Sequence, residues 1–148
     1  MVESFDTKYQ AIIGAIEDKI GTVSTIKTVY IGKRTRVADS ELPLAFIIPQ
    51  DSVFTAFSLR NTYLIRSEID IVVYNKYAKQ VMTSADYKSF MGLAGDIANA
   101  FRGDSTLGGT CRMLFISRYR PDYAEGQGYF ELFQVFTVVA EWLWVTEA

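Results

Sequence analysis

Two segments of the chain repeat their apolar residues every three or four positions, as one face of an α-helix does. They cover residues 5–20 and 84–102, and Gly21 and Gly103 are placed to end them. We therefore expect two helices that each bury one face. The residues predicted to face inward are Tyr9, Ile12, Ile13, Ile16 and Ile20 in the first helix, and Tyr87, Phe90, Met91, Ala94, Ile97, Ala98 and Phe101 in the second.

Elsewhere in the chain β-branched and aromatic residues predominate, which is typical of strands. Pro49 is expected to end one strand, because proline cannot donate a hydrogen bond to a neighbouring strand. Arg60 and Asn61 are expected to form a hairpin turn, with one bent strand as the alternative, and residues 121–128 are expected to form a second break. The predicted strands are residues 22–32, 44–48, 53–59, 62–74, 111–120 and 129–145.

The order of these elements predicts an α+β fold. We expect an antiparallel or mixed β-sheet with both helices packed on one face, and a long β-hairpin at the C-terminal end. Within residues 62–74 the side chains alternate, with Ile65, Ile69, Ile71 and Val73 on one face and Arg66, Glu68 and Asp70 on the other. No shift in composition divides the chain, so residues 1–148 are predicted to form a single domain.

Both faces of the last predicted strand are apolar. One face carries Leu132, Phe136, Val138, Ala140, Trp142 and Trp144, and the other carries Phe133, Val135, Val139, Leu143 and Val145. Two helices on one side of a sheet cover only one of these faces, so a neighbouring subunit is expected to cover the other. We expect Phe136, Trp142 and Trp144 at this subunit interface. A curved sheet that covers itself is the alternative.

The composition excludes most catalytic chemistry. The 148 residues include no histidine and a single cysteine, Cys111, so triads and metal sites that need imidazole are excluded. The glycine-rich phosphate-binding motifs are absent as well. Glu68 and Asp70 share a strand face, but a solvated surface that Arg66 can neutralise is the preferred interpretation. We therefore expect no catalytic residue, no metal site, no cofactor and no enzymatic activity.

Charge and hydropathy restrict the partners. The net charge is −2, and the most apolar run, residues 135–145, is too short to span a membrane. We therefore expect neither a membrane segment nor sequence-specific binding of nucleic acid. Two basic groups remain as candidates for phosphate contacts or for ion pairs between subunits. These are Lys33, Arg34 and Arg36 in the predicted loop 33–43, and Arg112, Arg118 and Arg120, which are expected on one face of the predicted strand 111–120.

The length, the order of elements and the terminal hairpin resemble the tail terminator proteins of long-tailed bacteriophages and the related tail-completion proteins of the neck. The resemblance extends over the whole chain. It rests on three segments: residues 66–74 (RSEIDIVVY), 90–101 (FMGLAGDIANAF) and 129–142 (YFELFQVFTVVAEW).

The resemblance implies a structural virion protein without a metal or cofactor. Proteins of this family form hexameric rings on the end of the tail tube, stop its polymerisation and present a surface to the head connector. The implied partners are further copies of the chain, the tail tube protein and the connector or stopper protein, with passage of DNA through the lumen. The implied location is the tail or neck of a virion assembled in the host cytoplasm. Lys33, Arg34 and Arg36 would contact a neighbouring subunit or the tube.

Two other functions stay open. One is a different neck or tail-tube adaptor protein of similar fold. The other is a small-molecule-binding α+β domain, whose curved sheet would enclose a cavity lined by Tyr63, Tyr129 and Phe133.

Overall fold

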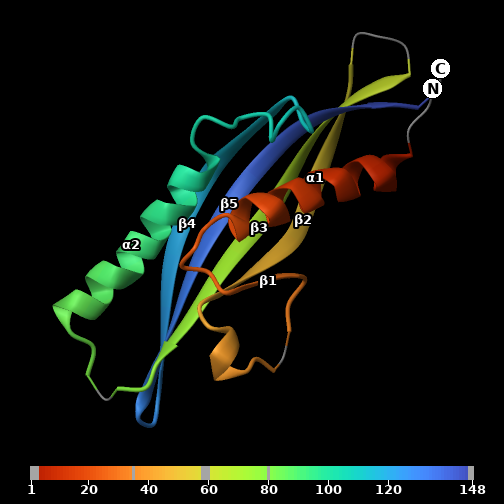
Figure 1. Ribbon diagram of the computed structural model, residues 1–148. Coiled ribbons are helices and arrows are strands. Elements are labelled where there is room, and N and C mark those ends of the chain that lie inside the picture. Colours follow the sequence, from red (N-terminus) through yellow and green to blue (C-terminus); the bar gives the residue numbers. More distant parts are fainter. Residues whose placement is uncertain (1–3, 35, 58–60, 80, 147–148) are drawn as a thin grey trace.

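The computed structural model describes residues 4–34, 36–57, 61–79 and 81–146 (Figure 1). Its elements, in chain order, are helix α1 (Phe5–Gly21), strand β1 (Thr28–Ile31), a short 3-10 helix η1 (Asp39–Glu41), strands β2 (Leu44–Ala56) and β3 (Thr62–Tyr77), helix α2 (Ser84–Phe101), and strands β4 (Met113–Gly126) and β5 (Tyr129–Val145). Both predicted helices are confirmed to within about a residue at each end.

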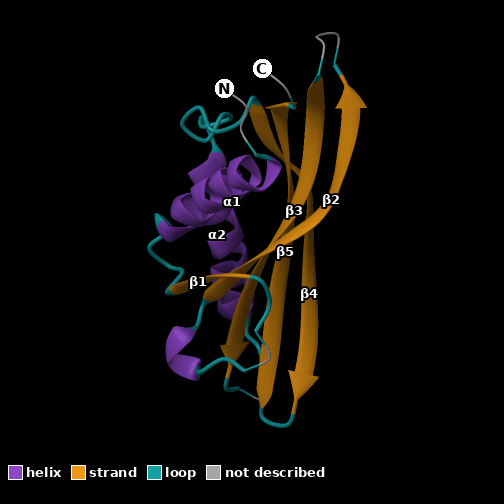
Figure 2. Ribbon diagram, turned by 90° about the vertical axis from the view of Figure 1, so that its right-hand side faces the viewer, coloured by secondary structure: helices purple, strands orange, loops and turns teal. Residues whose placement is uncertain are grey.

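The strands form one sheet in the order β1-β2-β3-β5-β4. β1 runs parallel to β2, and every other neighbouring pair is antiparallel, so the sheet is mixed. Both helices lie on one side of it (Figure 2). β4 and β5 form the C-terminal hairpin, joined at Gln127 and Gly128, where Gly128 takes a positive φ of 79°. The α+β fold, the two helices on one face and the terminal hairpin are therefore confirmed.

The main core lies between the helices and the sheet. α1 buries Ile12, Ile13, Ile16 and Ile20; α2 buries Phe90, Leu93, Ile97 and Phe101; β3 buries Ile65, Ile69, Ile71 and Val73. The predicted inward face of α1 is thus correct, since Tyr9 also packs against this core.

The predicted face of α2 is partly wrong. Met91 is 57% exposed, Tyr87 and Ala98 are also exposed, and Leu93 is buried instead. α2 packs near the β4 edge of the sheet (Figure 1). Only Phe90, Leu93, Ile97 and Phe101 of this helix are buried. About one residue per helical turn is buried in this contact, and the apolar residues on either side of it remain on the surface.

Two prolines do not end their strands. β2 continues through Pro49 to Ala56, and β4 continues through Pro121 to Gly126, so the expected breaks are wrong. Both prolines lie where the strand has a partner on one side only: β1 pairs with β2 no further than Ile47, and β4 is the outermost strand. A proline at such an edge costs little because no second strand needs its missing N–H group.

The predicted strand 22–32 is shorter than expected, since β1 covers only Thr28–Ile31. The predicted strands 44–48 and 53–59 are joined into β2, which pairs with β3 as the expected hairpin up to Ala56 opposite Tyr63. Of the expected turn, Arg60 lies outside the described residues, while Asn61 has a positive φ of 60°. An asparagine tolerates this conformation better than most residues do.

Candidate functional site

The sheet face opposite the helices, here called the helix-free face, is the largest surface that the strands leave uncovered by helices (Figure 2). Its side chains alternate along the strands with those of the core. On β3 they are Leu64, Arg66, Glu68, Asp70, Val72 and Tyr74, and on β5 they are Phe133, Val135, Thr137, Val139, Glu141 and Leu143. This surface is therefore mixed, with apolar and charged residues side by side.

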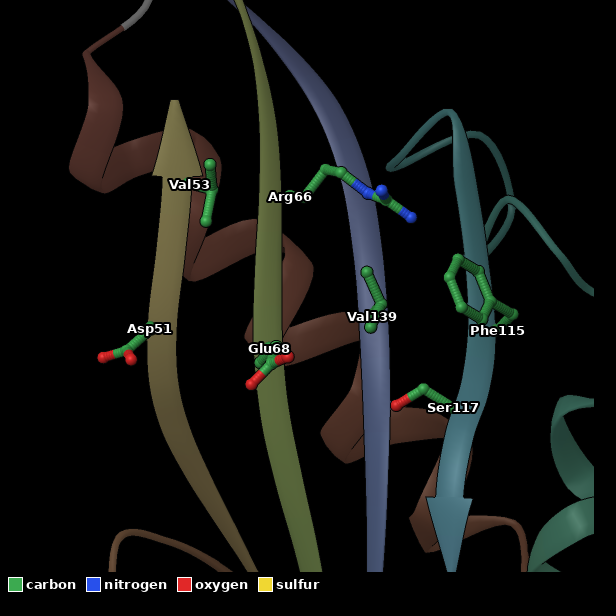
Figure 3. Close-up of a pocket in the computed structure, with 7 residues that line it drawn as sticks. All are labelled: Asp51, Val53, Arg66, Glu68, Phe115, Ser117 and Val139. Atoms are coloured by element: carbon green, nitrogen blue, oxygen red, sulfur yellow. The ribbon is translucent and has the colours of Figure 1, made fainter. Parts of the chain in front are cut away.

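A groove of about 460 Å³ lies in the middle of the helix-free face. It is lined by Asp51 and Val53 of β2, Arg66 and Glu68 of β3, Phe115 and Ser117 of β4, and Val139 of β5, all in front of the sheet with α1 behind it (Figure 3). The groove crosses four strands, so its floor is set by the register of the sheet and not by one loop.

Charges on this face are partly paired. Arg66 Nε lies 3.0 Å from Glu141 Oε1 on the neighbouring strand, and Thr137 Oγ1 donates a 2.7 Å hydrogen bond to Asp70 Oδ1. Arg66 therefore pairs across strands and not, as expected, with the acidic residues of its own strand. Within the described part of the chain, Glu68 and Asp51 form no ion pair.

Two of the predicted interface residues lie inside the subunit. Trp142 is 1% exposed and Phe136 is 3% exposed, both in the core beneath the helices. Trp142 Nε1 donates a 3.1 Å hydrogen bond to Ser67 Oγ, and its ring lies 5.2 Å from that of Phe5. Neither side chain reaches a surface where a neighbouring subunit could contact it, which corrects the expectation for both residues.

Trp144, the third predicted interface residue, is half-buried at the end of the sheet near the β2–β3 hairpin. Its ring stacks on Tyr63 at 5.9 Å and meets Phe5 and Phe54 edge-on at 5.4 and 6.1 Å. We call these four residues the aromatic end cluster. Phe54 is its most exposed member at 45%. The interface role of Trp144 stays a prediction, and Phe54 is the part of the cluster that a neighbouring molecule would meet first.

The predicted basic loop folds back on its own domain. Val37 and Leu42 pack with Phe46 in a second small core on the helix-free side. The Arg34 guanidinium lies 3.9 Å above the Tyr30 ring, and the Tyr30 hydroxyl donates to Glu41. This hydrogen bond lowers the pKa of Glu41 and raises that of Tyr30.

Lys33, Arg34 and Arg36 are all exposed to solvent, but only Arg34 stacks on a ring of its own subunit. The other basic group is divided in a similar way: Arg112 lies before β4 and faces the Phe57 ring at 5.7 Å, while Arg118 and Arg120 are exposed on the helix-free face of β4.

Cys111 is a buried thiol, and burial raises its pKa to about 11. It is therefore neutral at physiological pH and a poor nucleophile. Among the residues that the structure describes, no three His, Cys, Asp or Glu side chains gather as a metal site would require. In the same residues, no helix is long and apolar enough to span a membrane.

The cavity expected for a small-molecule site does not form. Tyr63 lies opposite Trp144 at one end of β5, and Tyr129 begins that strand at the other end, roughly 50 Å away at about 3.3 Å per residue. Phe133 lies between them on the opposite sheet face from Tyr63, stacked on Tyr74 at 4.9 Å. The three residues cannot line one pocket.

The two edges of the sheet were missed by sequence reasoning. On its outer side, residues 49–56 of β2 have no neighbouring strand in the described chain, and neither does β4 along its whole length. The exposed residues there include Asp51 and Phe54 on β2, and Arg118, Tyr119, Arg120 and Tyr123 on β4. Pro49 and Pro121 were the available signal, because prolines within strands are nearly confined to edges.

No protein-family model matches this chain, and no curated protein matches it in sequence. Among solved structures, the chain is similar to a component of the virion of a native gene transfer agent particle. The TM-score is 0.41 and the sequence identity is 16%, over 90% of this chain and 91% of that chain. A TM-score and identity this low assign neither a family nor a function.

Proposed function

We propose that this protein is a structural component of a phage-like virion, in which several copies form a ring that caps the tail tube and joins it to the head connector. Six subunits are the expected number. The proposal rests on the resemblance of the sequence to tail terminator proteins and on a fold that is suited to side-by-side assembly.

One observation carries the proposal: in the part of the chain that the structure describes, the outer sides of β4 and of residues 49–56 of β2, beyond the short β1, have no neighbouring strand. An unpaired edge presents a row of N–H and C=O groups that another strand can bind. Because the two free edges belong to different strands, the contact between two copies can be heterologous, with the β4 side of one facing the β2 side of the next. Repeated heterologous contacts close into rings when the rotation between subunits allows it.

The helix-free face supports the same function. It is mixed in character: the half-buried Val135 lies opposite Val72, and further along the same strands Arg66 lies opposite Glu141. In a closed ring, this face or the helices would line the lumen, and a mixed surface is compatible with solvent there. Lys33 and Arg36 are exposed and remain available for contacts with a neighbouring subunit or the tube.

Light scattering and electron microscopy of the purified protein test this function. We expect a mass of several subunits and closed rings that do not grow into tubes. Open tubes would favour the alternative role of a tube or adaptor protein. A monomer that persists at high concentration would overturn the assembly function altogether.

A further inference from the structure

We infer that the free β2 edge of one subunit pairs with the β4 edge of a second copy of this chain, through residues 49–56 and 117–125. This inference rests on the proposed ring, and it identifies the two surfaces that join the ring. Four features of the two edges support it: strand direction, extent, side-chain chemistry and the fixed positions of the aromatic rings.

Strand direction allows the pairing without inverting a subunit. β2 runs antiparallel to β3, β3 antiparallel to β5, and β5 antiparallel to β4, so β2 and β4 of one subunit run in opposite directions. A copy placed beside the first by rotation in a ring keeps its strands nearly aligned with those of its neighbour. Its β4 would therefore meet β2 as an antiparallel pair, in which hydrogen bonds run straight across between the strands.

The two edges are similar in length but offset along the strands. In β2 the exposed stretch is residues 49–56, interrupted only at the partly buried Ser52, and in β4 it is residues 117–125. The first lies toward the β2–β3 hairpin and the second toward the β4–β5 hairpin, at opposite ends of the sheet (Figure 1). The two stretches can meet only if the strands of each subunit are tilted relative to the ring axis. Strands in closed barrels are tilted in the same way.

Charges on the helix-free face are complementary. Asp51 is the only charged residue of the β2 stretch, and it lies on this face (Figure 3). Arg118 and Arg120 lie on the same face of β4, since they pair with Thr137 and Val135, and Asp122 follows them on that face, opposite Phe133. The charge match therefore requires a register that places Asp51 near the two arginines and away from Asp122. Within the described chain Asp51, Arg118 and Arg120 form no ion pair. Opposite charges on neighbouring strands stabilise the pair, whereas like charges directly opposite destabilise it.

Aromatic rings match on the helix-covered face. Phe54 extends from the aromatic end cluster to the β2 edge, and Tyr119 and Tyr123 lie on the same face of β4. All three are at least 40% exposed. They are also held in place: Tyr119 Oη donates a 2.6 Å hydrogen bond to Gln134 Oε1, and the Tyr123 ring lies 6.0 Å from Tyr87 and from Phe90. Aromatic pairs across strands are among the stronger contributors to pairing.

The edges also discourage pairing between like strands. Two β2 edges would bring Asp51 of each copy together without a cation. Pro49 and Pro121 each remove one N–H donor from any strand pair at these edges, so the proposed β2–β4 pair also lacks a hydrogen-bond donor at these two positions. Such edge charges and prolines protect sheets from unselective association. The β2 edge therefore favours a partner strand that places a cation near Asp51, such as Arg118 or Arg120 of β4.

Cross-linking of single-cysteine variants tests the pairing, because the native Cys111 is buried. Val53→Cys and Arg120→Cys place thiols on the helix-free face at the two edges. A mixture of the two variants, one of them tagged, should give a linked pair with a short bis-maleimide, while neither variant alone should link to itself. Asp18→Cys on the exposed surface of α1, mixed with Val53→Cys, is the matched control and should remain unlinked.

Self-linking of Arg120→Cys or of Val53→Cys would show like edges in contact and would overturn the inference. Closed rings that give no mixed link would also overturn it, yet would leave the proposed function standing. Mixed links in open chains that never close would support this interface and overturn the capping function. Monomers without links would overturn both.

Charge reversal gives an independent readout. Asp51→Lys should weaken association by on the order of 10-fold, and so should Arg118→Glu with Arg120→Glu. The chain that carries all three substitutions should recover most of the loss, because each interface again joins opposite charges. Unfolding curves are the control for folding. Equal weakening in the combined variant would overturn the charge match.

Discussion

The two faces of the sheet use the same strands in opposite ways. On β3, Ile65, Ile69 and Ile71 are fully buried beneath the helices, while Arg66 and Glu68 between them face solvent on the helix-free side. The two-residue period of a strand separates these roles along the middle of β3, whereas a second small core around Phe46 covers part of the helix-free side. The comparison teaches that stability comes mainly from one face, and that the other face and the edges remain available for other molecules.

The largest expected effect comes from the covered face. Trp142→Ala should lower the free energy of unfolding by about 3–5 kcal/mol, because it removes a fully buried ring and leaves the Ser67 hydroxyl without its indole donor. Urea denaturation measures the loss. The control is Phe115→Ala on the helix-free face, which is only half-buried and should cost about 1–2 kcal/mol. Equal losses from both variants would remove the distinction between the faces.

The second largest loss of stability is expected from removal of a buried side-chain amide. Gln134 is fully buried; its Nε2 donates a 3.0 Å hydrogen bond to the Phe90 carbonyl of α2, and its Oε1 accepts from Tyr119. Gln134→Ala should therefore cost about 1–3 kcal/mol, since it leaves polar groups without partners. Tyr119→Phe removes only one of these bonds and should cost about 1 kcal/mol. Thermal unfolding measures both variants. A larger loss of stability in Tyr119→Phe than in Gln134→Ala would contradict this ranking.

A smaller effect concerns the start of α2 and depends on pH. Hydrogen bonds from Lys79 and from the Thr83 backbone lower the pKa of Asp86 from 3.8 to about 2. A carboxyl group with a lowered pKa in the folded state stabilises the fold above its unfolded pKa and loses this contribution as the pH falls through the folded value.

The stabilisation by Asp86 should therefore be full above pH 4 and should disappear as the pH falls toward 2. The Lys79 side chain is 48% exposed, so solvent screening keeps the effect modest. Asp86→Asn should flatten this part of the stability curve, measured by urea denaturation at several pH values. An unchanged slope between wild type and variant would contradict the role of the carboxylate.

The smallest effect is expected on the helix-free face itself. Arg66 and Glu141 form an ion pair at 3.0 Å, but the arginine is half exposed, so Arg66→Ala should cost about 0.2–1 kcal/mol. The loss should shrink as salt is added. A double-mutant cycle with Glu141→Gln measures the coupling of the pair. A coupling of several kcal/mol, insensitive to salt, would show that this face is less open to water than the structure indicates.

Local patterns anticipated the elements well, but not the strand ends. Helical spacing found both helices, and alternation found the buried residues of β3. Pro49 and Pro121 were expected to end strands because a proline lacks the N–H group that a strand between two neighbours needs. Both lie at an edge, and no pattern within a few residues reveals which strands will be outermost. That order depends on contacts between segments far apart in the chain.

The sequence by itself determined that this protein has two amphipathic helices, an alternating central strand and a closing hairpin. These follow from periods of 3.6 and two residues and from turn-forming glycines, which act over short distances. Only the tertiary structure decided which apolar face of β5 the helices would cover, and hence that Phe136 and Trp142 are core residues. Both faces of that strand are apolar, so the face that becomes part of the core is set by where the helices, which are distant in sequence, pack on the sheet.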